Sequence, residues 1–309
     1  MQRQQKGAKL LWSVIIGCLA VIYLVSREDK RNHVQAIESW IGNSVACVPR
    51  SEVQVGQQNL QTAMAIPSKI VAHPPIGWSP PRHRLAVVVR TYPDHLHALP
   101  LMMGSLFAAC KRAGNVALRL VLVNTDPNSW QDNTFMGNVL QQTQWPLSSC
   151  PNSTVEVKTF PEQPWPNAYG YDYTQYALDY LLQDNESHDY FLFTNGDNLF
   201  NADLFKATLP FMDEGNDIIA YDFVTHHYRE GIMNTLVKVR FQLSFIDLGA
   251  ALFSQKAITA ARKDGLGTFI PERELTKDMF SRDWRFVEEL ISRPGVTTAI
   301  APGVLLFHQ

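Results

Sequence analysis

The chain lacks several features that mark common functional classes. Its formal net charge is −2 and it has no basic run interleaved with aromatic residues, which argues against a nucleic-acid partner. It contains no Gly-x-Ser-x-Gly elbow, so a serine hydrolase of that type finds no support. Residues 90–97 (RTYPDHLH), at the end of the first expected strand, include neither glycine nor lysine, which disfavours a phosphate-binding loop.

Long apolar runs are also scarce, and the one that stands out is residues 10–25 (LLWSVIIGCLAVIYLV). At ~1.5 Å per residue, a helix here would span on the order of 24 Å, which is short for a plasma membrane but suits a thinner endomembrane. A cleaved signal peptide is the alternative, but residues 24–26 (LVS) lack the small residue that cleavage needs at the first position. We therefore predict an uncleaved signal anchor, with the long C-terminal part outside the cytosol.

The few cysteines and two short triplets agree with an oxidising, non-cytosolic compartment. Residues 152–154 (NST) and 185–187 (NES) fit the N-glycosylation acceptor pattern. One of the four cysteines lies in the apolar run, which leaves Cys47, Cys110 and Cys150 and allows one disulfide. Cys110 and Cys150 are the favoured pair because both fall in the globular part, although connectivity cannot be read from a sequence.

Composition divides the chain into three parts. Residues 1–26 are a cytosolic tail and transmembrane signal anchor, and residues 27–83 are a polar stem that ends in a Pro-rich linker. Such a linker is extended and fairly stiff. Residues 84–309 remain, about 225 residues, which suits one large α/β domain.

Within this domain, continuous apolar segments alternate with helical patterns. Strands are expected at residues 85–90, 117–124, 154–160, 190–194 and 217–221. Helices are expected at residues 94–112, with Asp94 as its cap, and at 133–142, 171–182 and 203–212. This alternation predicts a mainly parallel sheet covered by helices on both faces.

Three of the expected strands end in polar groups: Arg90-Thr91, Asn124-Thr125-Asp126 and Asn195-Gly196-Asp197. Each of them alone is more often a turn. Because the carboxyl ends of parallel strands are where α/β sheets bind ligands, the three together predict a site at one edge of the sheet.

The segment Asn195-Gly196-Asp197-Asn198 is the most informative of the three. It offers hard oxygen ligands, the kind that hold Mg²⁺ or Mn²⁺ against a phosphate. Gly196 lets the backbone turn sharply and come close to a ligand. The alternative is a strand-to-helix turn in which Asp197 or Asn201 caps the next helix.

From about residue 84 to residue 308, the order of elements resembles the GT-A class of nucleotide-sugar-dependent glycosyltransferases. Most members are short-stemmed, single-anchor proteins of the secretory pathway, with an Asp-x-Asp motif at the end of a central strand. Here the motif reads Asn195-Gly196-Asp197, so an amide replaces the first carboxylate, while Asp197 remains as the expected metal ligand and Asn198 as a further oxygen donor. The fold implied is a single Rossmann-like GT-A domain of the α/β class.

Residues 247–253 (DLGAALF) resemble the Gly-containing strand that lies beneath the donor sugar and acceptor in this class. We expect a strand that opens with Asp247 and Gly249. The alternative is an ordinary core strand in which Asp247 caps an edge. His308 ends an apolar strand and matches the late histidine that often completes the metal shell.

Residues 281–290 (SRDWRFVEEL) resemble the segment that carries the catalytic base in many inverting members. The match assigns Asp283 as the base, with Glu288 and Glu289 as fallbacks. The alternative is that Asp283 only offsets the helix dipole or caps the helix. The segment favours inversion over retention.

The resemblance implies transfer of a sugar from a nucleoside-diphosphate donor to a hydroxyl of a glycan, glycoprotein or glycolipid, with Mn²⁺ or Mg²⁺ as a Lewis acid. Asp197 and His308 are the metal ligands and Asp283 is the base. Residues assigned to the donor or its surroundings are Arg90 and Thr91 (base), Asn124 and Asp126 (base or ribose), Asp172 (ribose or sugar), Asn195 and Gly249.

The resemblance also implies a single-pass type II protein of the Golgi or ER membrane, held by its N-terminal helix, with a lumenal and glycosylated catalytic domain. The main rival is a catalytically inactive lumenal carbohydrate-binding or scaffold protein on the same fold, which the amide at Asn195 favours. A nucleotidyltransferase ranks last, because residues 90–97 lack its phosphate loop.

Overall fold

The computed structural model describes residues 69–73, 79–92, 96–125, 147–160, 170–184, 186–225, 235–269 and 282–308, all within the unit Gln57–Gln309. The expected anchor at residues 10–25, the expected helix at 133–142 and Asp126 lie outside the described residues, so these remain predictions. In the part of the chain that the structure describes, no helix is long and apolar enough to cross a membrane.

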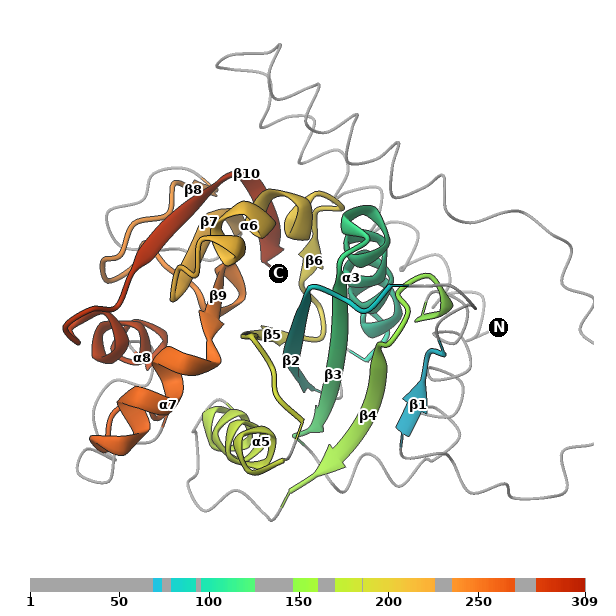
Figure 1. Ribbon diagram of the computed structural model, residues 1–309, viewed down its shortest axis with the longest axis horizontal. Coiled ribbons are helices and arrows are strands. Elements are labelled where there is room, and N and C mark those ends of the chain that lie inside the picture. The colour runs from blue at the N-terminus through green and yellow to red at the C-terminus, as the bar shows by residue number, and fades with distance from the viewer. Residues whose placement is uncertain are drawn as a thin grey trace, which may run out of the picture. The chain divides into compact units, whose positions relative to one another are not determined.

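A ten-stranded sheet runs through the described residues of this unit (Figure 1). Its order is β1 (Lys69–Val71), β4 (Thr154–Thr159), β3 (Val116–Asn124), β2 (His83–Thr91), β5 (Tyr190–Asn195), β9 (Ala251–Ser254), β7 (Ile218–Thr225), β10 (Thr298–His308) and β6 (Leu199–Phe200), with β8 (Leu236–Val237) paired to β7. The long pairings, β4–β3–β2–β5 and β7–β10, are parallel. The mainly parallel sheet is therefore confirmed, whereas the antiparallel insertion of β9 between β5 and β7 was not predicted.

Helices cover both faces of the sheet, as the uninterrupted apolar strands required. Successive strand residues point to opposite faces. On one face, Val87 and Leu120 belong to a core shared with α3 (Leu99–Ala113) and α6 (Leu204–Asp213). On the other, Val88 and Val121 pack in a core with α5 (Tyr171–Gln183), α7 (Gln255–Lys263) and α8 (Arg282–Ile291).

The first helix begins later than predicted. The N-cap of α3 is Ala98, and Asp94, the expected cap, lies outside the described residues. Pro100 stands in the first turn, where its missing N–H is tolerated. Gly114 ends the helix with a φ of 75°, a left-handed conformation that glycine adopts at little cost.

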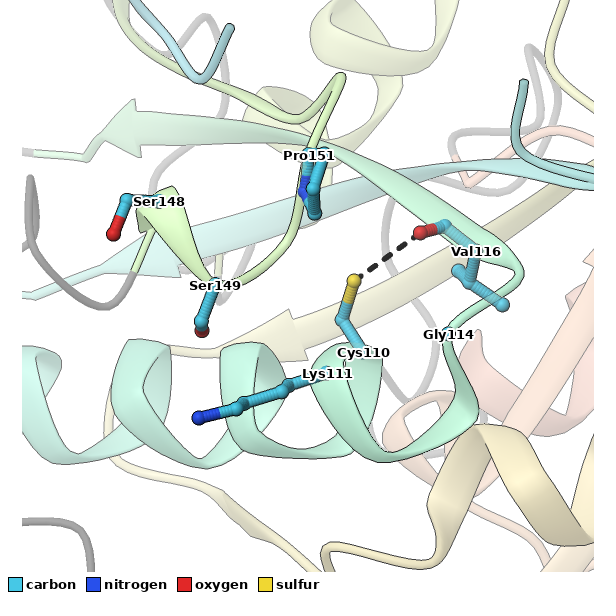
Figure 2. Close-up of a pocket in the computed structure, with 7 residues that line it drawn as sticks. All are labelled: Cys110, Lys111, Gly114, Val116, Ser148, Ser149 and Pro151. Atoms are coloured by element: carbon cyan, nitrogen blue, oxygen red, sulfur yellow. Dashed lines mark hydrogen bonds between the residues drawn. The ribbon is translucent and has the colours of Figure 1, made fainter. Parts of the chain in front are cut away.

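A small pocket of about 230 Å³ opens beside the end of α3 (Figure 2). Lys111 and Gly114 line it on one side, and Ser149 and Pro151 line it on the other. Val116, the first residue of β3, also lines the pocket and pairs with His83, the first residue of β2. The pocket therefore lies at the amino ends of β2 and β3. The predicted site lies at their carboxyl ends, so this pocket is not part of it.

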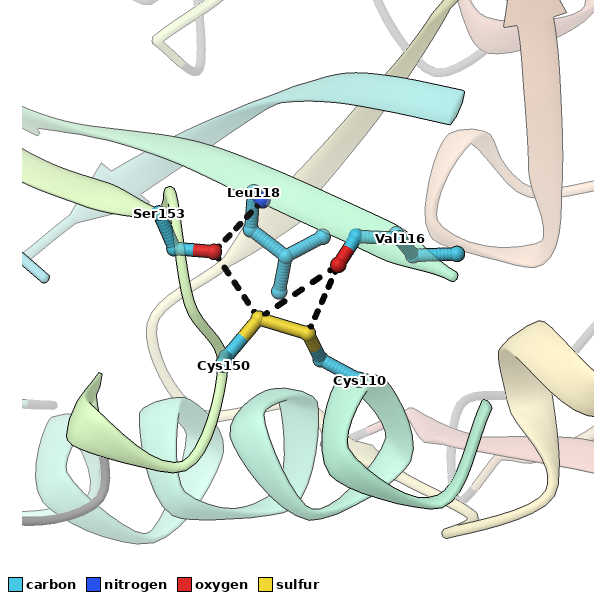
Figure 3. Close-up of a disulfide and its surroundings, with 5 residues drawn as sticks. All are labelled: Cys110, Val116, Leu118, Cys150 and Ser153. Atoms are coloured by element: carbon cyan, nitrogen blue, oxygen red, sulfur yellow. Dashed lines mark hydrogen bonds between the residues drawn. A yellow bond between two sulfur atoms is a disulfide. The ribbon is translucent and has the colours of Figure 1, made fainter. Parts of the chain in front are cut away.

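Cys110 and Cys150 form a disulfide with a Cα–Cα distance of 5.7 Å, which confirms the favoured pair (Figure 3). The bond joins α3 to the turn before β4. Beside it, the hydroxyl of Ser153 accepts a hydrogen bond of 2.8 Å from the amide of Leu118 on β3. Closing a loop of this length removes unfolded-state entropy worth about 4 kcal/mol in the chain-entropy model.

Candidate functional site at the carboxyl edge of the sheet

The polar ends of β2, β3 and β5 meet at one edge, as predicted. Arg90 on β2 pairs with Asn195 on β5, and Thr91 pairs with Asn124 on β3. Thr91 donates its hydroxyl hydrogen to the carbonyl oxygen of Val123 at 2.6 Å, so its side chain secures the strands. Parallel pairing alone is sufficient to bring these residues together.

The turn at residues 195–198 packs closely against β2. The amide of Gly196 donates to the carbonyl oxygen of Arg90 at 2.9 Å, and an ideal Cβ on Gly196 would lie 3.4 Å from Leu99 Cδ1. Asp197 is only 6% exposed. The N-cap of α6 is Asp203, so the alternative that Asp197 caps this helix is wrong. Asn201 lies in the turn before the helix and its Oδ1 accepts a hydrogen bond of 2.9 Å from the amide of Asp203, so the capping alternative holds in part for Asn201.

The segment that was expected to open as a strand begins instead as a short 3-10 helix, η3 (Leu248–Ala250), and β9 starts at Ala251. Asp247 is its N-cap, and its Oδ1 accepts a hydrogen bond of 2.9 Å from the amide of Gly249. The expectation of a strand from Asp247 onward is wrong because this capping bond favours the helical turn.

Gly249 lies where η3 approaches the turn after β5. An ideal Cβ at this residue would stand 3.2 Å from Asn198 Nδ2 and 3.3 Å from Asp247 Oδ1. Its carbonyl oxygen accepts a hydrogen bond of 2.8 Å from the hydroxyl of Tyr221. Such crowding disfavours any side chain, so the glycine permits the close approach of the two segments.

His308 ends β10 beside Thr225 at the end of β7. Its Nδ1 lies 3.2 Å from the hydroxyl oxygen of Thr225 and 3.7 Å from Oδ2 of Asp247. His308 and Asp247 are 9% and 7% exposed, respectively. The sequence identified His308 as a candidate metal ligand and Asp247 as the first residue of the segment expected beneath the donor, with capping as the alternative. Nothing in the sequence indicated that Asp247 and His308 lie side by side.

Among the described residues, no three His, Cys, Asp or Glu side chains form a group that could hold a metal ion. A complete protein-built shell around the predicted ligands Asp197 and His308 is thus not present in this part of the chain. Mg²⁺ sites that bind substrate phosphates use only one or two carboxylates and complete the shell with phosphate and water oxygens. Asp197 supplies one carboxylate and His308 one imidazole at this edge, which fits a site of that second type.

Helices α5 and α8 meet at their first turns. The hydroxyl of Tyr171 donates to Oδ1 of Asp283 at 2.5 Å, and the guanidinium of Arg90 lies 5.0 Å from the centre of the Tyr171 ring. Burial raises the pKa of Tyr171 well above its usual value, and the charge of Asp283 adds to this effect. Tyr171 is therefore a neutral hydrogen-bond donor to Asp283.

Two other acids on α8 were named as fallbacks for the base. Glu289 accepts a hydrogen bond of 2.7 Å from the amide of Gly267 and so fastens the loop that follows α7. Glu288 is exposed. Neither has a described contact with Arg90 or Tyr171, so Asp283 is the better candidate.

Arg90 lies between two groups of the site, the predicted base Asp283 and the Asp247–His308 pair. Burial by itself lowers its pKa, but the neighbouring Tyr92, Tyr171, Asp283 and Asp247 outweigh burial and raise the pKa above its usual value. The guanidinium is therefore a fixed positive charge between the predicted base and the Asp247–His308 pair.

Asp172 is 1% exposed, and neither oxygen of its side chain has a hydrogen-bond partner among the described residues. Burial raises its pKa from 3.8 to about 6, and the charge of Arg282 opposes that change. A buried carboxyl group without partners destabilises a fold. Strongly shifted groups of this kind are concentrated at functional sites.

No family model and no curated protein sequence matches this chain, whereas several solved structures resemble it. Residues 1–349 of TarS from S. aureus give a TM-score of 0.49 at 16% identity, covering 73% of this chain and 60% of that one. The same fragment in complex with UDP-GlcNAc gives 0.46 at 14% identity, covering 72% and 58%.

The mannosyltransferase PcManGT from Pyrobaculum calidifontis, in complex with GDP-Man and Mn²⁺, gives a TM-score of 0.44 at 14% identity. It covers 76% of this chain and 60% of its own. This chain thus spans about three fifths of the length of these structures. Identities this low bear on the fold alone, and TM-scores below 0.5 support no conclusion about function.

Proposed function

We propose that the protein is a glycosyltransferase on a GT-A-like domain, moving a sugar from a nucleoside-diphosphate donor to an acceptor hydroxyl. One observation carries the proposal. The turn at Asp197, the glycine Gly249, the histidine His308 and the Arg90–Tyr171–Asp283 group all come to the carboxyl edge of one mainly parallel sheet. Segments that are distant in sequence thus supply both the proposed metal ligands and the proposed catalytic base.

A divalent ion, Mn²⁺ or Mg²⁺, would act as a Lewis acid for the leaving diphosphate. Asp197 and His308 are the residues proposed to hold it. Both are buried, as a ligand set shielded from bulk water should be. Arg90 and Asn124, at the ends of β2 and β3, flank the region proposed for the base and ribose of the donor.

Asp283 is proposed as the general base of an inverting reaction. Its carboxylate accepts the proton of the acceptor hydroxyl while that oxygen attacks the anomeric carbon and the nucleoside diphosphate leaves. The hydrogen bond from Tyr171 holds Oδ1, which orients the carboxylate. A retaining reaction would not need this base.

We also propose that the chain is a single-anchor type II protein of the Golgi or ER membrane, with its catalytic domain in the lumen. The apolar run at residues 10–25 and the two glycosylation triplets support this proposal. The disulfide between Cys110 and Cys150 agrees with an oxidising compartment.

The test is binding of a panel of UDP- and GDP-sugars to the full chain in detergent, with and without Mn²⁺. The Asp197→Ala variant should lose Mn²⁺-dependent binding, whereas a variant of the exposed Glu288, Glu288→Ala, should keep it. A folded wild-type protein that binds no donor would overturn the proposal. It would favour the alternative of an inactive carbohydrate-binding or scaffold protein, which the amide at Asn195 supports.

A further inference from the structure

The turn before β4 carries one of the two N-glycosylation triplets, Asn152-Ser153-Thr154. The amide of Ser153 donates to the carbonyl oxygen of Cys150 at 3.3 Å, which closes a four-residue turn. Pro151 fixes a negative φ at the second position of this turn, and Asn152 has a φ of 62° at the third. These signs define a type II turn, which takes Gly or Asn at its third position. Turn geometry by itself therefore accounts for the presence of Asn152.

The fold does not use the side chain of Asn152. Its backbone amide donates to the carbonyl oxygen of Ala72 at 3.1 Å, which ties the turn to the segment after β1. The residue is half-buried, and its side-chain amide has no hydrogen-bond partner among the described residues. The preceding Pro151 lines the pocket at the end of α3, so open space lies beside the turn (Figure 2). A group attached to Asn152 would leave the domain without breaking a hydrogen bond.

The two hydroxyl groups of the triplet differ in what they do for the fold. The hydroxyl of Ser153 accepts from the amide of Leu118 at 2.8 Å and lies 2.8 Å from Sγ of Cys150 (Figure 3). Thr154 opens β4, and in the part of the chain that the structure describes its Oγ1 is buried without a hydrogen-bond partner. A buried hydroxyl without a partner destabilises a fold. Val is β-branched like Thr and favours strands as well, so the fold alone would prefer Val at this position.

N-glycosylation requires the hydroxyl that the fold does not. The acceptor pattern needs Asn and, two residues later, the hydroxyl of Ser or Thr. This hydroxyl is recognised in the chain before it folds, so its later burial is no obstacle. The modified Asn, in contrast, has to remain at the surface because the attached glycan is bulky and hydrophilic. Asn152 and Thr154 meet these two requirements.

We propose that Asn152 is N-glycosylated and that the hydroxyl of Thr154 serves this modification and not the fold. In the transfer, Nδ2 of Asn152 forms a bond to the anomeric carbon of an oligosaccharide carried on a lipid diphosphate. The bond from that carbon to the diphosphate breaks, the lipid diphosphate leaves, and the amide nitrogen loses one proton. The inference rests on the lumenal location in the proposed function, because the modification takes place in that compartment.

The test uses the full chain produced in a eukaryotic secretory pathway. Enzymatic release of N-linked glycans in heavy-oxygen water converts each glycosylated Asn to a labelled Asp, which peptide mass spectrometry locates. We expect the label at residue 152 in the wild type and its loss in Thr154→Val. Thr154→Ser keeps the hydroxyl and should keep the label. Asn185→Gln, in the other triplet, should leave the label at residue 152 unchanged.

Two variants that both lack this glycan test whether the hydroxyl of Thr154 serves the fold. Asn152→Gln removes the acceptor, and Asn152→Gln/Thr154→Val removes the unpartnered hydroxyl as well. Because Val fills nearly the same space as Thr, we expect the double variant to have the higher Tm. A lower Tm in the double variant would assign the hydroxyl to the fold and overturn that part of the inference.

An unlabelled residue 152 in the wild type would overturn the inference. If residue 185 is labelled in the same sample, the domain is lumenal and only this inference fails. If neither residue is labelled, protease treatment of sealed membrane vesicles separates the two proposals. A digested domain would overturn the lumenal location as well, whereas a protected domain would confine the failure to this inference.

Discussion

The hydroxyl of Tyr171 and Oδ1 of Asp283 are joined by a hydrogen bond of 2.5 Å that links the first turns of α5 and α8. The Tyr171 ring in turn lies beneath the guanidinium of Arg90. The residue proposed as the base is therefore held by a neighbour that no sequence motif indicated. This relationship leads to a kinetic prediction.

Tyr171→Phe should lower kcat about 10-fold with little change in the KM for the donor, since a hydrogen bond to a charged group contributes roughly 1.5–3 kcal/mol. Steady-state kinetics with the donor identified by the binding panel would measure this. Asp283→Asn should cost more, about 10²- to 10⁴-fold in kcat, because it removes the base itself. Full activity in Asp283→Asn would rule out both roles.

The buried carboxyl group of Asp172 should make stability depend on pH. Its pKa is 3.8 in its ordinary state and about 6 in the folded chain, so the folded state binds more protons between these values. The free energy of unfolding should therefore fall as pH rises from about 4 to about 6. This difference between the two pKa values lowers the free energy of unfolding by at most about 3 kcal/mol above pH 6.

Asp172→Asn should remove this dependence. Urea unfolding of the wild type and the variant at pH 4.5, 6 and 7.5 would show their difference in stability growing with pH. Using the difference cancels the opposite contribution of His188, whose pKa burial lowers to about 4. A difference that stays constant across this range would contradict the prediction.

Gly170 should tolerate alanine less well than another glycine of the same conformation. Its φ is 75°, and an ideal Cβ would lie 2.6 Å from the hydroxyl oxygen of Tyr92 and 3.3 Å from Arg90 Cδ. Gly114 has the same φ but open space around it, so Gly114→Ala should cost only the backbone strain of about 1–2 kcal/mol. Thermal unfolding should show a larger loss for Gly170→Ala, together with weaker donor binding as Arg90 is displaced. Equal losses of thermal stability in Gly170→Ala and Gly114→Ala would contradict this prediction, because they would mean that the Tyr92 side chain moves aside without cost.

Arg119 should be needed for stability although it lies away from the site. Its Nε lies 2.7 Å from Oε1 of Glu156 and its Nη2 lies 2.7 Å from Oδ2 of Asp184, and both Arg119 and Glu156 are buried. Arg119→Met should cost about 3–5 kcal/mol in chemical denaturation, because it removes the buried cation from Oε1 of Glu156 and leaves that carboxylate with Tyr180 and Lys158 at Oε2 alone. Arg119→Met/Glu156→Leu should regain most of that loss. A double variant no more stable than the single one would show that packing, not charge, dominates.

The sequence alone was sufficient for most of the sheet and for part of the site. The run Leu85–Val89 is apolar at every position, which is typical of a strand covered on both faces, and β2 contains that run entirely. The meeting of Arg90 with Asn195 then follows from parallel pairing, since every such strand ends at the same edge. Boundaries were less accurate. Helix α3 starts at Leu99 because local turn and proline geometry, not apolar period, decides where a helix begins.

Only the tertiary structure decided which distant side chains meet. The reversal of β9 and the 3-10 turn before it place Asp247 beside His308, and the facing starts of α5 and α8 place Tyr171 on Asp283. Apolar periodicity records which face of an element is buried, but it carries no information about which polar side chain of another element lies opposite. Those pairs depend on how the packed elements are positioned, and that is determined by contacts across the whole core.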